Sequence, residues 1–367
     1  MIKLPRDIAI EEYLNQMKLI QNAFLRLLNT EKDQEDESQK LILLLNSYEI
    51  CDDCHKLRSF LHLISKIYNN YKHQSHFYDF FEKIILYYKE KIQQYYSNGD
   101  IFTIFKGNKK ILLFLLKSNI LTIDNFVLSE MDRKGYSFYF LPEIKNFFEQ
   151  NDERYKNFLY NSHKQDIQKE IPENFEENRE KGENHSYLCE LIRNDSVDEF
   201  IAYVNQKSIS LSSKISDSIY ETHSFLVKNK NIQLIEYAAF FGSIQIFQYL
   251  LSKDVELIPS LWHYAIHSGN AELIHILEEK KLKPPKKSYK KCFNESIKCH
   301  HNDIANYIFS NHLNANNSDY YALKYYNFAF LANDFLKKCS FNDFCHFDYS
   351  FIVNCDMKKN IFVLILS

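Results

Sequence analysis

Glycine and proline are scarce in this chain, with six residues of each among 367, and tryptophan occurs once. The glycines are too far apart to form GxGxxG or GxxxxGK[ST], so neither a dinucleotide fingerprint nor a P-loop is present. A GxSxG nucleophile elbow is absent as well. So few turn-forming residues also argue against a turn-rich β-sandwich. No linear motif indicates an enzyme, and we predict a protein without catalytic activity.

Long apolar runs are missing too. The strongest, at residues 41–45, 111–116 and 361–366, are far shorter than the roughly 18 residues that a membrane-spanning helix needs. Acidic residues interrupt the N-terminal segment MIKLPRDIAIEEYL before it can form the apolar part of a secretory signal. We therefore expect no membrane segment, a cytoplasmic location with a nuclear one as the alternative, and eight reduced cysteines.

Neither sign of charge is in excess, since 45 Lys and Arg residues accompany 48 Asp and Glu residues. A net charge of -3 gives no global attraction for nucleic acid or membranes. Aromatic residues are abundant instead, with 30 Phe and 26 Tyr, and we expect most of them to fill the core. The aromatic residues of polar segments are candidates for exposure: Tyr136, Phe138, Tyr139, Tyr320, Tyr321, Tyr325 and Tyr326.

Apolar residues recur at helical spacing over residues 6–28, 39–48, 56–68 and 77–95, and no long stretch alternates with a period of two. We therefore predict an all-α fold. The acidic segment 31–38 and the polar segment 161–185 have the composition of linkers.

Two segments are similar to each other without a gap, at an offset of 27 residues: IEYAAFFGSIQIFQYL at 235–250 and WHYAIHSGNAELIHIL at 262–277. They share a small residue, a glycine four positions later and a leucine eight positions after the glycine. These residues are Ala238, Gly242 and Leu250 in one copy, and Ala265, Gly269 and Leu277 in the other. Weaker copies are centred on Gly107, Asp195 and His300, with Thr103, Leu191 and Ser296 at the small position.

This pattern is typical of a helix-turn-helix unit. The glycine permits the left-handed backbone that ends the first helix, and the small residue lets a neighbouring unit approach. A single unit cannot bury its apolar stripe alone, so units stack. We predict a helical solenoid of stacked repeats.

The segment SLWHYAIHSGNAELIHIL, at 260–277, resembles an ankyrin repeat, with His263 at the position of the family's histidine. We expect Ser260 to cap the first helix together with His263, and Trp262 to lie in the core. The spacings of 27 and 31 residues between turn positions are shorter than the ankyrin period of about 33. The resemblance therefore implies a shortened or absent finger between repeats.

Residues 39–345 are similar to protozoan ankyrin-repeat proteins that carry a domain of unknown function ahead of their repeats. Stretches such as DDCHKLRSFLHLISKIYNNY, NKKILLFLLKSNILTID and LIEYAAFFGSIQIFQYLL carry this similarity. It implies a divergent helical domain at 1–160, repeat-like at 97–120, then a linker at 161–185 and ankyrin-like repeats at 186–345. The ending KKNIFVLILS leads us to expect a divergent or truncated end at 346–367.

Three groups of residues have the spacing of metal ligands. Cys51, Cys54 and His55 form CxxCH, which suits haem attachment or, with His62, zinc, but no second CxxC follows. The second group is Cys292, Cys299, His300 and His301. In the third, His263 and His267 are four residues apart without the glutamate of HExxH. We expect structural roles for all three groups and no cofactor.

Seven lysines lie within twelve residues: Lys280, Lys281, Lys283, Lys286, Lys287, Lys290 and Lys291. Pro284 and Pro285 predict an extended loop here, which could contact phosphates or act in nuclear import. The acidic balance of the chain and the single aromatic residue of the run, Tyr289, argue against nucleic acid. We predict a non-catalytic adapter or scaffold for a protein partner. A nucleic-acid-associated protein and a metal-binding protein remain the alternatives.

Overall fold

The computed structural model describes residues 5–30, 34–71, 76–148, 171–313, 319–331 and 345–353. These residues form helices joined by turns, with no strand among them and one isolated antiparallel bridge between Lys214 and Gln233. The predicted all-α class is confirmed. Within the described ranges, no helix combines the length and the hydropathy needed to cross a membrane.

The chain divides into two compact units that do not follow the order of the sequence. The first unit comprises residues 1–84, 239–242 and 257–367, and the second comprises 85–238 and 243–256. The predicted linker at 161–185 lies outside the described residues as far as position 170, and within its described part the helix α12 spans Phe175–Lys181 with Phe175 and Arg179 buried. The predicted C-terminal segment 346–367 also lies outside the described residues beyond position 353.

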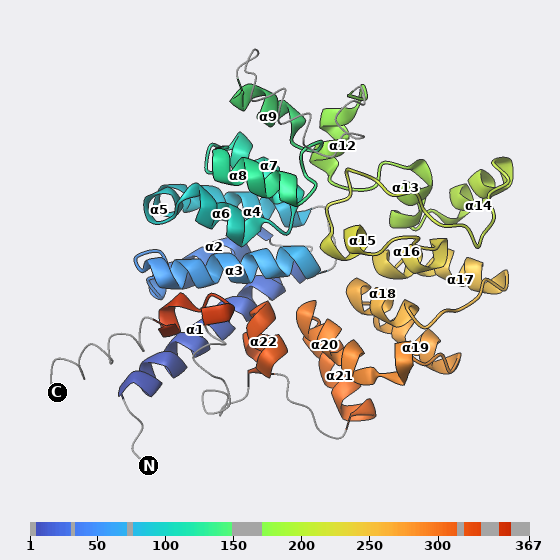
Figure 1. Cartoon of the computed structure of the whole chain (residues 1–367). Coiled ribbons are helices and arrows are strands. Elements are labelled where there is room, and N and C mark those ends of the chain that lie inside the picture. The colour runs from blue at the N-terminus through green and yellow to red at the C-terminus, as the bar shows by residue number, and fades with distance from the viewer. Residues whose placement is uncertain are drawn as a thin grey trace. The chain divides into compact units, whose positions relative to one another are not determined.

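The first unit contains the two ends of the described chain and the last helix pairs (Figure 1). Its helices are α1 (Pro5–Asn29), α2 (Gln34–Ser47), α3 (Cys54–Asn70), most of α4 (His76–Tyr87), α18 (Leu261–Ser268), α19 (Ala271–Glu279), α20 (Tyr289–Lys298), α21 (Asn302–His312) and α22 (Asp319–Tyr325), with short 3-10 turns at Pro285–Lys287 and Phe328–Phe330.

The second unit is built from shorter helices. They are α5 (Lys89–Tyr95), α6 (Asn98–Phe105), α7 (Lys109–Lys117), α8 (Asn125–Arg133), α9 (Leu141–Phe147), α12 (Phe175–Lys181), α13 (Tyr187–Arg193), α14 (Val197–Gln206), α15 (Ser224–Lys228), most of α16 (Leu234–Phe241) and α17 (Ile244–Ser252).

Local sequence signals explain where several helices begin. The Oδ1 atom of Asp53 accepts hydrogen bonds from the backbone N–H groups of His55 and Lys56, so it caps α3. The prediction of a linker over residues 31–38 is wrong from position 34 onward, because α2 begins at Gln34. Its first turn carries three acidic residues, and negative charge stabilises the N-terminal end of a helix.

The two ends of the described chain meet in the first unit. Nε2 of Gln21, in α1, donates a hydrogen bond of 2.8 Å to Oδ1 of Asn327, which follows α22. Nε of Arg58, in α3, donates one of 2.8 Å to Oδ2 of Asp348. Figure 1 accordingly shows the red C-terminal elements beside blue α1 and α3. Contacts between residues about 300 positions apart therefore close this unit.

Four pairs of short helices share one turn geometry: α13–α14, α16–α17, α18–α19 and α20–α21. The turn residue of each pair has a positive φ: 51° at Asp195, 74° at Gly242, 67° at Gly269 and 58° at His300. These are four of the five turn positions that the repeat pattern predicts. The fifth, Gly107 between α6 and α7, is not among the glycines of positive φ, so that proposed copy does not share the geometry.

A further turn of the same kind follows α22. Tyr326 has a φ of 57°, and Ala322, four residues earlier, is fully buried. The backbone N–H of Asn327 donates to the carbonyl of Ala322 at 2.9 Å, as the N–H of Ser243 does to the carbonyl of Ala238 at 3.0 Å. This bond spans five residues and closes the helix end. The small position therefore supplies the carbonyl that accepts the closing bond.

One side-chain hydrogen bond connects successive pairs within each unit. The residue after the turn donates it to a carbonyl near the end of the preceding pair's first helix. Asn327 donates through Nδ2 to the carbonyl of Ile297 in α20 at 2.9 Å. His301 donates through Nε2 to the carbonyl of His267 in α18 at 3.2 Å. In the second unit, Oγ of Ser243 donates to the carbonyl of Ile192 in α13. The carbonyls of Ile192 and Ile297 also accept backbone N–H groups of the following turn, those of Asp195 and His300, so there the side-chain bond is a second hydrogen bond to the carbonyl.

Candidate functional site

Most residues that the repeat pattern singled out lie in the core. Trp262 is fully buried, and its Nε1 donates a hydrogen bond of 2.9 Å to the carbonyl of Leu282. The small residues and leucines of both copies are buried as well: Ala238, Leu250, Ala265 and Leu277. Gly242 and Gly269 occupy the turns. These residues hold the helix pairs together.

The expected capping by Ser260 is wrong. Ser260 precedes α18 with an α-helical backbone, at φ -60° and ψ -25°, and its side chain makes no capping hydrogen bond. A capping side chain needs the extended backbone of an N-cap residue to reach back to the first turn. His263 lies half-buried in α18.

The CxxCH segment lies at the start of α3. Cys51 is buried in the preceding turn, and Cys54 and His55 are the first two residues of the helix. His62, the proposed additional ligand, lies 2.8 Å from Oδ2 of Asp348 through its Nε2. Among the described residues, Cys51, Cys54, His55 and His62 do not form a group of three side chains close enough to bind one metal ion.

Cys292, Cys299 and His300 do not form a metal-binding group either. Cys292, in α20, and Cys299, directly after that helix, are both fully buried. The ring of His300 points elsewhere, with Nδ1 at 3.0 Å from Nε2 of Gln21 and Nε2 at 3.0 Å from the carbonyl of Tyr325. A residue with a left-handed backbone points its side chain away from the helix that it ends. Helical spacing along the sequence therefore predicts the wrong direction for the side chain of His300.

Cys299 instead belongs to a group that the sequence analysis did not assemble. Donor atoms of His267, Glu295 and Cys299 all lie within 4.8 Å of one another, the one such group of three within the described ranges. Nε2 of His267 lies 2.7 Å from Oε1 of Glu295, and Sγ of Cys299 lies 3.4 and 3.6 Å from the two ring nitrogens. The packing of α18 against α20 brings these three side chains together.

The charges of this group are set by burial and hydrogen bonding. Burial lowers the pKa of His267 to about 4, against the effect of Glu295, and raises the pKa of the Cys299 thiol well above its usual value. Burial also acts to raise the pKa of Glu295, but the hydrogen bond from His267 and the charge of Lys298 outweigh it. The group therefore contains a neutral imidazole, a thiol and a carboxylate, with Nζ of Lys298 2.5 Å from that carboxylate.

The seven lysines of residues 280–291, which we call the lysine segment, are all exposed. None of them has an ion pair with another described residue. The predicted extended loop is correct only in part. A 3-10 turn occupies Pro285–Lys287, and Lys290 and Lys291 lie in the first turn of α20. Since the helix begins directly after Ser288, these last two lysines project from a helix and not from a loop.

Packing holds the lysine segment in place. Trp262 binds the carbonyl of Leu282 inside it, as described above. The ring of Tyr289 packs edge-on against Trp262 at 5.3 Å and stacks on His312 at 3.9 Å between centroids. The single aromatic residue of the segment is thus engaged in internal contacts. The segment presents lysines on an ordered backbone.

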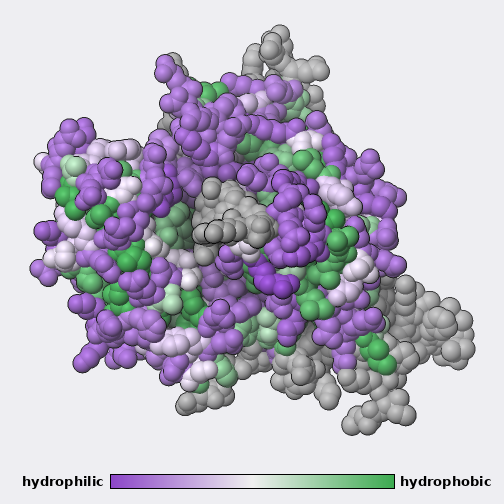
Figure 2. All heavy atoms as spheres, turned by 180° about the vertical axis from the view of Figure 1, so that it is seen from behind, coloured by the Kyte–Doolittle hydropathy of each residue, from purple (hydrophilic) through white to green (hydrophobic). Residues whose placement is uncertain are grey.

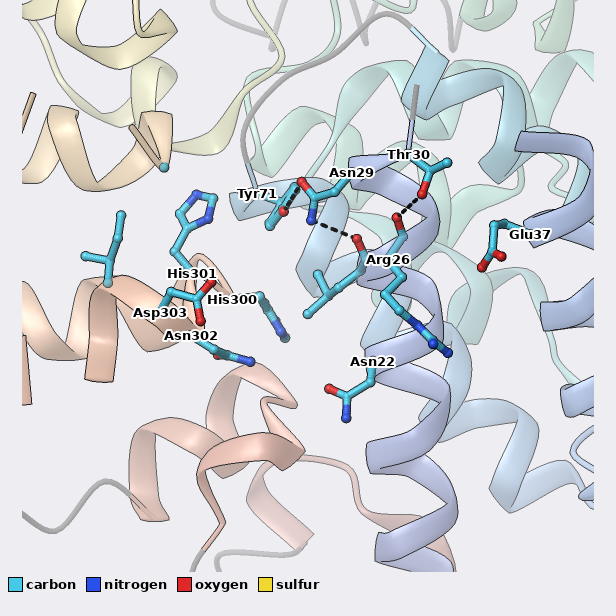
Figure 3. Close-up of a pocket in the computed structure, with 13 residues that line it drawn as sticks. Asn22, Arg26, Asn29, Thr30, Glu37, Tyr71, His300, His301, Asn302 and Asp303 are labelled. Carbon is cyan, nitrogen blue, oxygen red and sulfur yellow. Dashed lines mark hydrogen bonds between the residues drawn. The ribbon is translucent and has the colours of Figure 1, made fainter. Parts of the chain in front are cut away.

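A polar hollow of about 880 Å³ lies between α1 and the turn that joins α20 to α21 (Figure 3). His301, Asn302 and Asp303 stand on one side of it, and side chains of α1, Arg26 among them, on the other. The hydroxyl of Tyr71 donates a hydrogen bond of 2.9 Å to Oδ1 of Asn29 at its margin. The hollow is open and its lining is rich in amides, which suits hydrogen bonding to a polar surface.

Hydrophilic residues cover most of the face that Figure 2 shows, with apolar residues in small groups between them. Among the aromatic residues that were candidates for exposure, Phe138, Tyr139 and Tyr326 are buried, whereas Tyr320 is 47% exposed. Tyr139 and Tyr326 direct their hydroxyls to backbone carbonyls, those of Arg179 and Phe347. Hydrogen-bonded tyrosines of this kind are not available to a partner.

Glu295 is the residue that sequence reasoning missed. The signal that could have found it is its spacing of four residues from Cys299, which places both side chains on one face of a helix. Comparisons with known proteins add no further assignment: no protein-family model matches the chain, no curated protein is similar to it, and no solved structure resembles it.

Proposed function

We propose that this protein is a non-catalytic protein-interaction module, an adapter or scaffold built from ankyrin-like helix pairs stacked as a solenoid. The observation that carries the proposal is the recurring side-chain bond from the residue after a turn to the first helix of the preceding pair. Asn327, His301 and Ser243 each make it. A repeated connection of this kind supports stacked repeats, and stacked repeats present extended surfaces for partners.

The lysine segment is the surface that we propose for the partner. Its seven exposed lysines lack internal acidic partners among the described residues, so their charge is available to another molecule. Ordering by Trp262 and Tyr289 reduces the conformational entropy that the backbone loses on binding. The chemistry of the surface fits an acidic segment of a protein, in the cytoplasm or the nucleus.

Nucleic acid is the second candidate for this surface, because lysines also neutralise phosphates. Binding of single strands usually adds aromatic side chains on which bases stack. Tyr289 is held between Trp262 and His312 and does not offer a free ring face of this kind. This arrangement favours a protein partner.

The test uses the full chain as bait in nuclease-treated lysate of its own cells, at low and moderate salt. The variant Lys280→Glu/Lys286→Glu/Lys287→Glu changes the lysine segment. The matched control, Lys207→Glu/Lys214→Glu/Lys253→Glu, changes the net charge equally at three exposed lysines elsewhere. We expect a discrete protein on the wild type and the control, and loss of at least nine-tenths of it on the segment variant.

A captured protein is then titrated directly against the three purified forms. An acidic partner should bind the wild type and the control alike, with an affinity that falls as salt rises. Equal capture by all three forms would remove the lysine segment as the site. If nuclease abolished all capture, the nucleic-acid alternative would replace the protein partner.

A further inference from the structure

We infer that His267, Glu295 and Cys299 form a binding site for one divalent transition-metal ion, and that zinc is the ion that fits it best. The three side chains come from two neighbouring helices and converge at one point inside the first unit. Imidazole nitrogen, carboxylate oxygen and thiolate sulfur are the three donor types that proteins use for zinc.

Rotations of two side chains would convert the present contacts into a tetrahedral site. Bonds of about 2.0 Å to nitrogen and about 2.3 Å to sulfur, at tetrahedral angles, place those two atoms about 3.5 Å apart. Sγ of Cys299 lies 3.6 Å from Nε2 of His267 but also 3.4 Å from Nδ1, so it lies against the ring. A rotation of the Cys299 side chain has to bring it beside Nε2 when the ion binds. The 2.7 Å hydrogen bond between His267 and Glu295 would have to open to about 3.3 Å, which a small rotation of the Glu295 side chain provides.

The helical register supports the same conclusion. Cys299 directly follows α20 and keeps a helical backbone, at φ -81° and ψ -1°. It lies four residues after Glu295, so both side chains are on the face that packs on α18. His267 is fully buried on the facing side of α18. The side chain of Glu295 keeps 21% of its surface exposed, which leaves a route from solvent. Three protein ligands leave one coordination position for water.

Binding exchanges one proton of the protein for the ion. Zn²⁺ replaces the proton of the Cys299 thiol, so the S–H bond breaks, a Zn–S bond forms and the proton passes to the buffer. The imidazole stays neutral: its proton, which lies on Nε2 in the bond to Glu295, moves to Nδ1, and Nε2 binds the ion. The thiolate and the carboxylate cancel the charge of the ion, and the ammonium of Lys298, 16% exposed, remains as one positive charge beside the site. The thiolate also favours zinc over magnesium or calcium, which prefer oxygen ligands.

Lys298 acts as a positioning residue in this site. Its Nζ lies 2.5 Å from Oε1 of Glu295, so it fixes the carboxylate without being a ligand. Hydrogen bonds to ligating carboxylates orient them and tune metal affinity. Without metal, the same contacts form a buried hydrogen-bonded group, and this is the alternative that the experiment has to separate.

The test is a titration of the reduced, chelator-treated full chain with Co²⁺. Cobalt bound to a thiolate gives a charge-transfer band in the near ultraviolet. We expect one cobalt ion per chain with this band, its displacement by one equivalent of Zn²⁺, and release of one proton per ion. Cys299→Ser should abolish the band. Glu295→Gln, which keeps the shape of the side chain, should weaken binding at least about 100-fold, since even outer partners of metal ligands affect affinity by 10- to 100-fold.

Cys292→Ser is the matched control, because Cys292 is an equally buried cysteine seven residues before Cys299. It should bind cobalt with the wild-type band. Fluorescence of Trp262, the one tryptophan, checks that each variant is folded. If Cys299→Ser does not fold, Glu295→Gln provides the test instead. Zinc should raise the Tm of the wild type and should not raise that of Glu295→Gln. No band in the wild type, a band retained in Cys299→Ser, or wild-type affinity in Glu295→Gln would each overturn the site.

Discussion

Arg179 and Glu143 form a buried bidentate ion pair that fastens α12 to α9 in the second unit. NH1 and NH2 of Arg179 donate hydrogen bonds of 2.7 and 2.8 Å to the two carboxylate oxygens of Glu143. NH1 also donates to the carbonyl of Tyr139, and the arginine side chain is 1% exposed. The planar guanidinium matches a carboxylate in a way that lysine cannot.

Arg179→Met should lower the free energy of unfolding by about 3–5 kcal/mol, because it leaves the carboxylate of Glu143 without its cation in a mostly buried place. The double variant Arg179→Met/Glu143→Met should lose less, since apolar side chains replace a buried pair at little cost. Urea denaturation measures all three proteins.

The control for this prediction is the exposed ion pair between Lys117 and Glu180, which joins α7 to α12. Lys117→Met should change the stability by less than about 1 kcal/mol, as exposed pairs contribute little. A double variant at Arg179 and Glu143 that is less stable than Arg179→Met would contradict the argument.

Asp195 connects the pair α13–α14 to α17 by capping that helix. Its two carboxylate oxygens accept hydrogen bonds from the backbone N–H groups of Gln245 and Ile246, at 3.0 and 2.9 Å. Asp195→Ala should cost about 2 kcal/mol, with the lost cap and the positive φ contributing about equally.

Asp195→Gly separates these two contributions, because glycine adopts the positive φ without strain and lacks only the cap. It should lose about 1 kcal/mol by urea denaturation. Asp195→Asn, which tolerates the conformation and keeps one acceptor, should lose less than either. Equal losses for Gly and Ala would show that the backbone conformation contributes nothing.

The repeat could be predicted from the sequence at positions where the geometry requires a particular type of residue. Ala238 and Gly242 match Ala265 and Gly269 because a close approach needs a small side chain and a left-handed turn favours glycine. Tyr326 ends α22 with the same conformation, but a tyrosine at this position carries no such signal. Non-glycine residues in the left-handed region are uncommon, and tertiary packing decides where they occur.

The bond between successive pairs could not be predicted for a related reason. Serine, histidine and asparagine make it at positions 243, 301 and 327, so geometry is conserved between copies while residue type is not. The candidate metal site was missed because Glu295 and His267 are 28 positions apart. Only the packing of α18 on α20 reveals that they face each other.

Gly242 and Gly269 should differ in their tolerance of alanine, although both have a positive φ. A Cβ atom at Gly269 would lie 2.6 Å from Cε1 of His301, whereas one at Gly242 would find its nearest neighbour at 3.6 Å. Gly242→Ala should cost about 1 kcal/mol from backbone strain alone. Gly269→Ala should cost at least about 1 kcal/mol more, because the ring of His301 must move and its bond to His267 is lost.

Fluorescence of Trp262 during urea denaturation reports this difference, since the residue is fully buried in the same unit as Gly269. His301→Ala in combination with Gly269→Ala removes the clash and should recover part of the loss. Equal destabilisation by the two alanine variants would show that contact with His301 is not what limits position 269.

Glu221 should make the stability of this protein fall as pH rises through neutrality. Burial raises the pKa of its carboxyl to about 7, and the hydrogen bond from the backbone N–H of His223 only partly offsets this. Its Oε2 atom has no hydrogen-bond partner among the described residues, and the side chain lines a cavity of about 60 Å³ together with Lys109. The folded protein therefore keeps the carboxyl protonated up to a pH at which the unfolded chain has lost the proton.

The sign follows from proton binding. Between the unfolded pKa of about 4.3 and the folded pKa of about 7, the folded state binds one proton more than the unfolded state. The contribution of Glu221 to stability is therefore complete below this range, decreases through it by about 4 kcal/mol and stays constant above it.

Glu221→Gln removes this dependence, because the amide mimics the protonated acid at every pH. Compared with the wild type, the variant should gain about 3 kcal/mol of stability between pH 4.5 and pH 8. Urea denaturation across this range measures the difference, with the exposed Glu199→Gln as control. A constant difference between Glu221→Gln and the wild type would mean that the folded protein ionises this carboxyl as easily as the unfolded chain does. The cavity beside Lys109 would then have to hold enough water to solvate the carboxylate.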